Sequence, residues 1–238
     1  PQNGDGTMIR YNATFVNNPG FRGAILQIND SPPSVIAINS RGAALSDAVL
    51  KGVSIIEGAR SPKELEFPEQ HGWFNSFLFY PNRTKGGISS EAPGLRLPIN
   101  EGPNNLHGVP HPFKVMWDEE AYHGGSEQAF VQYATTINRH NAGKDTDFPY
   151  SLRLEVRYQL DREGRLRIRI RAENTGKERA PFALGLHTYL ALRDDKDQLK
   201  PIDGLELKLP GTAIGVTDED MIPTEAIEQV QNFEGGRY

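Results

Sequence analysis

Apolar and polar residues alternate along several short stretches of this chain, with the repeat of two that β-strands show. Four runs are rich in aliphatic and β-branched residues: Ile25–Ile28, Val35–Ile38, Val53–Ile56 and Ala129–Tyr133. The 24 glycines and 17 prolines are scattered between such runs, as turn residues between strands usually are. No long window keeps the apolar repeat of about 3.6 residues that a helix needs. The pattern therefore predicts an all-β fold.

The clearest predicted element is a hairpin near residue 160. Apolar residues alternate with charged or amide residues along its first strand, from Leu152 to Leu160, and again along its second strand, from Leu166 to Arg171. The segment Asp161–Gly164 supplies turn residues between the two. Because successive side chains of a strand point to opposite faces, we expect the apolar set to face a core and the polar set to face solvent.

The second strand of this hairpin carries a row of arginines: Arg165, Arg167, Arg169 and Arg171. Such a row is compatible with a face that binds nucleic acid or phosphate. However, Glu155 and Glu173 lie among these arginines, and the net charge of the chain is -5. A nucleic-acid binder usually carries a basic excess. We therefore interpret the row as the solvated outer face of a sheet and expect no nucleic-acid partner.

The chain is expected to form one domain over residues 1–238, because it contains no fixed repeat and no low-complexity linker. A second strand pair is predicted from Phe182–Leu186 to Leu205–Leu209. Hydrophobic residues make up 37% and charged residues 24%, as in ordinary soluble proteins. No apolar run approaches the roughly 20 residues of a membrane helix, so no membrane association is expected.

Cysteine is absent, which excludes disulfides, thiolate metal sites and cysteine nucleophiles. The absence does not separate the cytoplasm from the periplasm. We expect a cytoplasmic location and leave the periplasm open.

Two histidines four positions apart, His107 and His111, have a spacing found in helical zinc sites. Gly108 and Pro110 prevent a helix through this interval, so no metal site is expected. His107 follows two asparagines and precedes a glycine, which is typical of a turn that exposes the imidazole. His187 lies in an apolar segment, where a lone histidine is more often an interior residue with hydrogen-bond partners than a catalyst.

Polar residues also follow the apolar run that ends at Pro81. Asn82 and Arg83 would be delivered by that run to a loop, where both side chains could meet a ligand.

The order of several short segments resembles that of aldose 1-epimerases and of their hexose-6-phosphate epimerase relatives. Asn82-Arg83 is followed by Leu97–Asn100 and then by Asn105–Gly108, which together are similar to the first histidine region of this family. Gly185–Tyr189 resembles the second histidine motif, and Val216–Thr224 resembles a later segment that ends in Pro-Thr-Gly. The resemblance covers about residues 40 to 238.

The resemblance implies a large antiparallel β-sandwich of the galactose mutarotase-like supersandwich type. It also implies an isomerase that interconverts sugar anomers by opening the pyranose ring, without metal or other cofactor. By motif match, His187 would be the acid that protonates the ring oxygen. His107 would form a hydrogen bond near this oxygen. Asn82 and Arg83 would bind the hydroxyls of a small sugar or sugar phosphate.

The chain departs from the family pattern at several positions. Thr188 replaces the proline of the second motif, Leu190 replaces an aromatic residue, and Glu225 replaces the glycine of Pro-Thr-Gly. No segment before Tyr238 matches the family's sugar-binding aspartate or its glutamate base, and the family's C-terminal strands are expected to be lacking. Either the remainder is missing from this chain, or a shortened relative has lost or relocated its base.

These departures leave three alternatives to a free-aldose epimerase. The first is a carbohydrate-binding protein of the same fold with an incomplete catalytic site. The second is a hexose-6-phosphate 1-epimerase, in which Arg83, Lys85 and Arg96 could contribute to phosphate binding. The third is an all-β interaction module that carries two histidines by chance. The sequence does not determine the oligomeric state.

Overall fold

The computed structural model describes residues 8–18, 21–58, 77–79, 83–89, 92–108, 115–142, 148–182, 184–191, 193–194, 198–201 and 212–229. All regular elements in these ranges are β-strands that pair antiparallel, which confirms the predicted all-β class. Within the same ranges there is no helix of the length and apolarity that crossing a bilayer would require.

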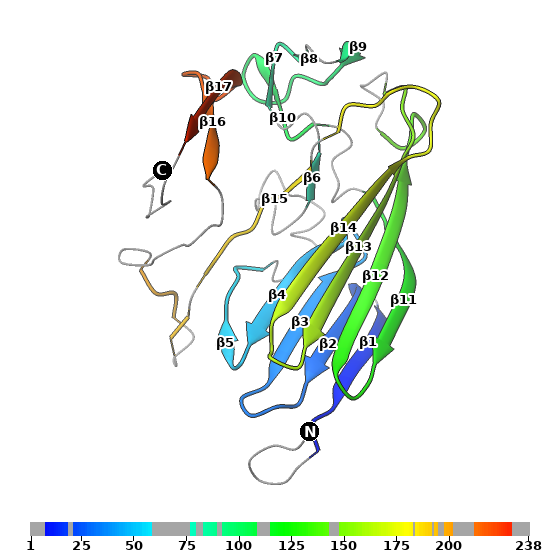
Figure 1. The fold of residues 1–238 in the computed structure, drawn as a ribbon, viewed down its shortest axis with the longest axis vertical. Helices are drawn as coiled ribbons and strands as arrows, with labels where there is room; N and C mark the ends of the chain where they lie inside the picture. The colour runs from blue at the N-terminus through cyan, green and yellow to red at the C-terminus, as the bar shows by residue number, and fades with distance from the viewer. Residues whose placement is uncertain are drawn as a thin grey trace.

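Two antiparallel sheets account for most of the described chain (Figure 1). Each sheet is a meander, in which strands that are consecutive in the sequence are neighbours in the sheet. The first sheet contains β1 (Tyr11–Asn18), β2 (Phe21–Ile28), β3 (Ser34–Asn39), β4 (Ala44–Leu50) and β5 (Val53–Ser54). The second contains β11 (Asp118–Gly124), β12 (Gln128–Ile137), β13 (Leu152–Asp161) and β14 (Leu166–Asn174).

Four short strand pairs lie beyond these sheets, toward the upper part of Figure 1. They are β6 (Phe77–Phe79) with β15 (Leu184–Leu186), β7 (Arg83–Lys85) with β10 (Asn104–Leu106), β8 (Ile88–Ser89) with β9 (Ala92–Arg96), and β16 (Ala213–Thr217) with β17 (Pro223–Gln229).

The predicted hairpin near residue 160 is confirmed as β13 and β14, with Leu160 opposite Leu166. Gly164 has a positive φ of 73° and donates its N–H to the Asp161 carbonyl at 2.9 Å. Glycine adopts this left-handed conformation without the steric cost that a side chain adds. The turn residues therefore set the register of this hairpin.

The pairing of the segment near residue 185 differs from the expectation. Leu184–Leu186 pairs with Phe77–Phe79, a segment far earlier in the chain. The expected partner, Leu205–Leu209, lies outside the described residues. Short strands of three residues carry little periodic signal, so their partners cannot be chosen from alternation alone.

The core lies between the two sheets. Along β13 every second residue is buried, and β2 and β3 bury side chains in a similar alternation. Together these strands form one cluster of buried apolar residues, whose members from both sheets include Leu26, Ile36, Val131, Leu154 and Val156. Burying these rows against each other removes apolar area from water, which is the main force that holds such sandwiches together.

A buried side-chain hydrogen bond also joins the two sheets. The Tyr158 hydroxyl on β13 donates to the Ala43 carbonyl, in the turn between β3 and β4, at 2.6 Å. Tyr158 is fully buried, and burial raises the pKa of its hydroxyl, so the group stays protonated and remains a donor. Ala43 has a positive φ of 46°, an unusual conformation for a residue with a side chain. The bond therefore holds a constrained turn of one sheet against the other.

Replacing Tyr158 with Phe should test the energetic weight of this contact. The variant keeps the ring but leaves the Ala43 carbonyl without this donor, so we expect the free energy of unfolding to fall by about 1–3 kcal/mol. Urea denaturation measures this change. The matched Tyr122→Phe variant alters a tyrosine that is 56% exposed and should stay within about 0.5 kcal/mol of the parent. Equal effects of the two variants would contradict the interpretation.

Candidate functional site

His107 follows directly after strand β10, which pairs with β7. In this strand pair Leu106 lies opposite Arg83, so His107 leaves the strand beside the start of β7. His107 has a positive φ of 68°, and Gly108 after it has a φ of 62°. Two consecutive left-handed residues turn the chain sharply at this point. The turn predicted from Asn105, His107 and Gly108 is therefore present.

Two asparagine side chains hold this turn. Asn100 bonds to both backbone groups of Leu106: its Nδ2 donates to the carbonyl at 3.0 Å, and its Oδ1 accepts from the N–H at 2.7 Å. Asn105, which is fully buried, donates from Nδ2 to the Pro98 carbonyl at 2.8 Å. Its Oδ1 accepts the N–H of Gly108 at 3.2 Å. The residues on both sides of His107 are thus fixed by side-chain bonds.

The expectation that this turn exposes the imidazole is wrong. His107 is only 5% exposed. The reason is that its ring packs against a second histidine, which a turn motif in the sequence does not reveal.

His187 begins the segment that follows strand β15 and is half-buried. The next residues run beside the end of the first sheet: Leu190 forms a bridge with Ile56, and the Tyr189 carbonyl accepts the N–H of Glu57 at 2.8 Å. Backbone contacts on both sides therefore position His187, first through β6 and then through the first sheet.

The two histidine rings meet edge to face, with centroids 5.2 Å apart and planes at 88°. The Tyr189 ring stacks on the His187 ring, with centroids 5.1 Å apart and an interplanar angle of 26°. The order is therefore His107, His187, Tyr189, from the buried interior to a residue that is 38% exposed. The sequence placed both histidines in the site, but it did not indicate their contact or the role of Tyr189.

Burial lowers the pKa of the His187 imidazole below its ordinary value of 6.5, and a backbone hydrogen bond of the same residue opposes this shift in part. Burial acts this way because the charged imidazolium loses hydration. When protonated, His187 is consequently a stronger acid than a solvated histidine. It can give up a proton to an acceptor near neutral pH.

Arg83 is half-buried on β7, which pairs with the strand that directly precedes His107. Asn82, its predicted companion, lies outside the described residues, as does His111. Three glutamates lie near the end of the chain, none in the context of the family's glutamate base: Glu225 and Glu228 are exposed on β17, and Glu234 lies outside the described residues. The structure thus brings Arg83 and the two histidines to one region but does not bring these glutamates into described contact with them.

Next to the His187 segment lies an open depression of about 960 Å³. Its lining is largely polar and includes Ser46, Asp47, Glu57, Arg193 and Gln198. The carboxylate of Glu57 pairs with the Arg193 guanidinium at 2.7 Å. The backbone of Glu57 contacts the segment that follows His187, whereas its carboxylate is paired with Arg193.

The sequence model described as Aldose 1-epimerase matches residues 25–235 of the chain. Galactose mutarotase of Sus scrofa is 30% identical over 170 residues, which are 70% of this chain and 45% of that protein. Galactose mutarotase of Bos taurus is 29% identical over 185 residues, 74% of this chain and 50% of that protein. The chain spans about half the length of the curated relatives it matches.

Solved structures show the same fold. A galactose 1-epimerase from Lactobacillus acidophilus superimposes with a TM-score of 0.67 at 20% identity, over 94% of this chain and 64% of that one. A galactose mutarotase-like protein from Clostridium acetobutylicum superimposes with a TM-score of 0.66 at 18% identity, over 89% of this chain and 66% of that one. The antiparallel β-sandwich of the mutarotase-like type, expected from the sequence, is therefore confirmed.

Replacing Asn105 with Ala should loosen the turn that holds His107. The buried N–H of Gly108 and the Pro98 carbonyl lose their partner, and we expect the free energy of unfolding to fall by about 1–3 kcal/mol. Urea denaturation measures this loss. Asn12→Ala, which truncates an exposed asparagine on β1, serves as the control and should change stability by less than about 0.5 kcal/mol. An unchanged stability of the Asn105 variant would show that these bonds carry no weight.

The pKa of His187 is predicted to be below 6.5 in an NMR titration of its imidazole. Tyr189→Ala, which uncovers the ring, should raise this pKa toward 6.5, whereas Tyr189→Phe, which keeps the stacked ring, should not. A pKa above 6.5 in the parent chain would refute the burial argument.

The lowered pKa of His187 also predicts the direction in which the free energy of unfolding changes with pH. The unfolded chain binds the proton more tightly than the folded chain. The contribution of His187 to the free energy of unfolding therefore decreases as pH falls from 6.5 to the lower folded pKa. His187→Gln should remove this component.

Proposed function

Because this chain belongs to the aldose 1-epimerase family, we propose that it interconverts the α and β anomers of a free aldose by opening the pyranose ring. The observation that carries the proposal is the contact between His107 and His187, whose rings lie 5.2 Å apart although they come from distant segments. Imidazoles suit proton transfer at neutral pH because their pKa lies near 6.5.

The reaction moves two protons. A base takes the proton of the anomeric hydroxyl while an acid protonates the ring oxygen, and the bond between C1 and that oxygen breaks. The new carbonyl end then rotates, and the ring closes on its other face by the reverse steps. The reaction needs an acid close to the ring oxygen and a base on the anomeric side.

His187 is assigned the role of acid. Its half-buried imidazole, with a pKa held below the ordinary value, releases a proton readily to the ring oxygen. His107, buried behind it in a turn fixed by two asparagines, is assigned a hydrogen bond near the same oxygen, where it would stabilise the developing alkoxide. A donor held in place beforehand stabilises such charge more than a mobile one.

Arg83 is assigned to the sugar hydroxyls, because the planar guanidinium presents several N–H donors to paired oxygens. Asn82 would act with it. The base is not assigned to any described residue, since Glu57 is paired with Arg193 and the glutamates of β17 are exposed. The sugar is proposed only as a small aldose.

The proposal predicts that this chain accelerates the mutarotation of freshly dissolved α-D-galactose and α-D-glucose, followed by polarimetry. His187→Ala should lower the catalysed rate by about 10²- to 10⁴-fold, because a positioned acid contributes on that scale. The matched control is His140→Ala, which removes an exposed histidine outside the site and should leave the rate unchanged.

Each other outcome contradicts part of the proposal. If the parent chain, both variants and buffer give the same decay, the chain does not catalyse free-hexose mutarotation. Saturable binding of galactose without acceleration would then indicate a carbohydrate-binding role, and acceleration confined to hexose 6-phosphates would indicate a phosphosugar epimerase. If the parent and His187→Ala are equally active, the acid has been assigned to the wrong residue.

A further inference from the structure

The outer face of the second sheet, on the side away from the core, is covered by charged residues of β13 and β14. Alternation along β13 buries the apolar side chains and leaves the intervening ones at the surface. The surface residues are Arg153, Glu155, Arg157 and Gln159 on β13, with Arg167, Arg169, Arg171 and Glu173 on β14. The sequence alone favours a solvated face. The structure shows that the arginines of this face are not equivalent.

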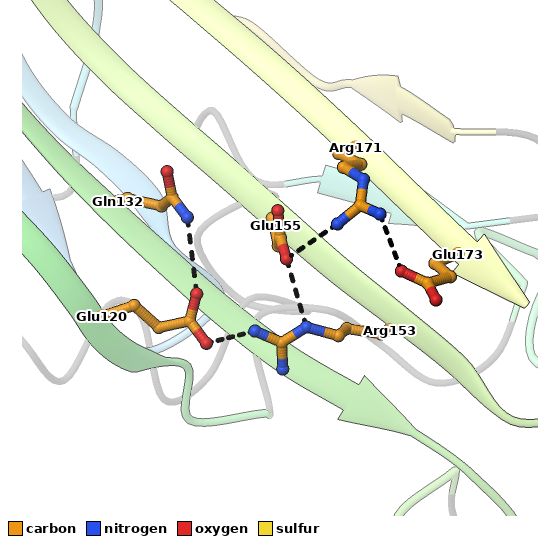
Figure 2. A network of polar contacts seen from close by, with 6 residues as sticks. All are labelled: Glu120, Gln132, Arg153, Glu155, Arg171 and Glu173. Carbon is orange, nitrogen blue, oxygen red and sulfur yellow. Dashed lines mark hydrogen bonds and ion pairs between the residues drawn. The ribbon is translucent and has the colours of Figure 1, made fainter. Parts of the chain in front are cut away.

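At one end of the face the arginines are neutralised (Figure 2). Arg153 pairs with Glu120 and, at 3.1 Å, with Glu155. Arg171 bonds to the same Glu155 at 3.3 Å and to Glu173 at 2.9 Å. Each positive charge in this network has at least one carboxylate, so the network offers little free charge to a ligand.

At the other end a single carboxylate, Asp161, serves two arginines. Its side chain accepts from Arg165 at 3.0 Å and lies 3.5 Å from Arg167. Arg165 also pairs with Glu163 at 3.0 Å.

Arg157 and Arg169 lie between these two ends and directly opposite each other in the register of β13 and β14. Neither forms an ion pair with any residue in the part of the chain that the structure describes. Like charges directly across a strand pair destabilise the sheet. The arrangement is therefore unfavourable unless a counter-charge binds between them.

Arg157 is held in place by its surroundings. Its Cζ lies 3.9 Å from the centroid of the Phe130 ring, and Gln132 is its register neighbour on β12. The Nε of Arg157 is buried and has no hydrogen-bond partner among the described residues. A buried donor without an acceptor is costly, so Arg157 holds its position at a cost that its own side-chain contacts do not offset through Nε.

Two shallow open depressions meet at this arginine pair. One, of about 390 Å³, is lined by both arginines together with Gln159, Arg167, Ile168 and Ile170. The other, of about 240 Å³, is lined by the same pair with Gln132, Glu155 and Arg171. The surface is thus hollowed at the two arginines that have no carboxylate partner in the described part of the chain.

We propose that Arg157 and Arg169 form a binding site for a phosphate-type oxyanion, free or carried by a small organic molecule. Two guanidinium groups can grip such a group through paired N–H donors. The site is separate from the histidines, which lie on segments that follow β10 and β15. A polyanion would require a longer row of free arginines, whereas the flanking arginines here are already paired.

The test is isothermal titration calorimetry with inorganic phosphate and, separately, with glucose 6-phosphate. The parent chain should bind both ligands. Arg169→Gln, which removes an exposed guanidinium, and Arg157→Gln should each weaken binding by roughly tenfold to a hundredfold, as expected for the loss of a charged hydrogen-bond pair. Arg165→Gln is the matched control, because it removes the same charge from an arginine already engaged by Asp161 and Glu163. Its affinity should stay within about twofold of the parent.

The proposal is overturned if phosphate does not bind, or if Arg165→Gln weakens binding as much as Arg169→Gln, which would indicate only a general effect of charge. It is also overturned if glucose 6-phosphate alone binds and His187→Ala abolishes that binding, which would place the ligand at the histidines. Mutarotation by Arg169→Gln should equal that of the parent, so a failure of this proposal and a failure of the proposed reaction give different results.

Discussion

The burial of two apolar sheet faces against each other is the constraint on which the other features of this structure depend. The strands of each sheet are consecutive in the sequence, so the packing of one sheet on the other supplies the main contacts between residues far apart in the sequence. The bond from Tyr158 to the Ala43 carbonyl lies in this interface. Nearby, the N–H of Trp117 donates to the Ser40 carbonyl, and the N–H of Gly42 donates to the Val115 carbonyl, each at 2.8 Å. These two bonds fix the segment just before β11, the first strand of the second sheet, to the turn between β3 and β4.

The histidine site depends on this frame without belonging to either sheet. His187 is anchored because the residues after it run along the end of the first sheet, and His107 is anchored by the strand pair of β7 and β10 and by two asparagines. A left-handed backbone at a histidine is uncommon and has an energetic cost. The hydrogen bonds of Asn100 and Asn105 offset that cost. They keep the imidazole buried against its partner rather than free in solvent.

The sequence predicts the parts of the fold that have a repeated signal. The hairpin of β13 and β14 has a long alternation in each strand and a turn that contains a glycine between them, so both strands and their pairing could be inferred. The pair of β6 and β15 has only three residues in each strand and joins distant segments, so the partner of Leu184–Leu186 could not. The two histidines were identifiable from their motifs. The burial of His107 was not, because it results from contact with a ring that is remote in the sequence.

The arginine row shows the same limit at the level of charge. Alternation predicts correctly that these side chains share one face, but the pairing of each arginine depends on the carboxylates of neighbouring strands. Glu120 on β11 reaches Arg153 across β12, a contact that no local pattern indicates. Two arginines of one row can therefore differ completely in available charge, depending on register alone.

The low pKa of His187 has two opposing effects on its proposed role. At neutral pH fewer molecules carry the protonated imidazole, which lowers the amount of active acid. Each protonated imidazole, however, transfers its proton more easily to a weakly basic ether oxygen such as that of a pyranose ring. The best catalytic pKa lies near the working pH, because both factors enter as a product. Tyr189 stacks on the ring, so this aromatic residue, rather than a charged neighbour, is well placed to set the balance.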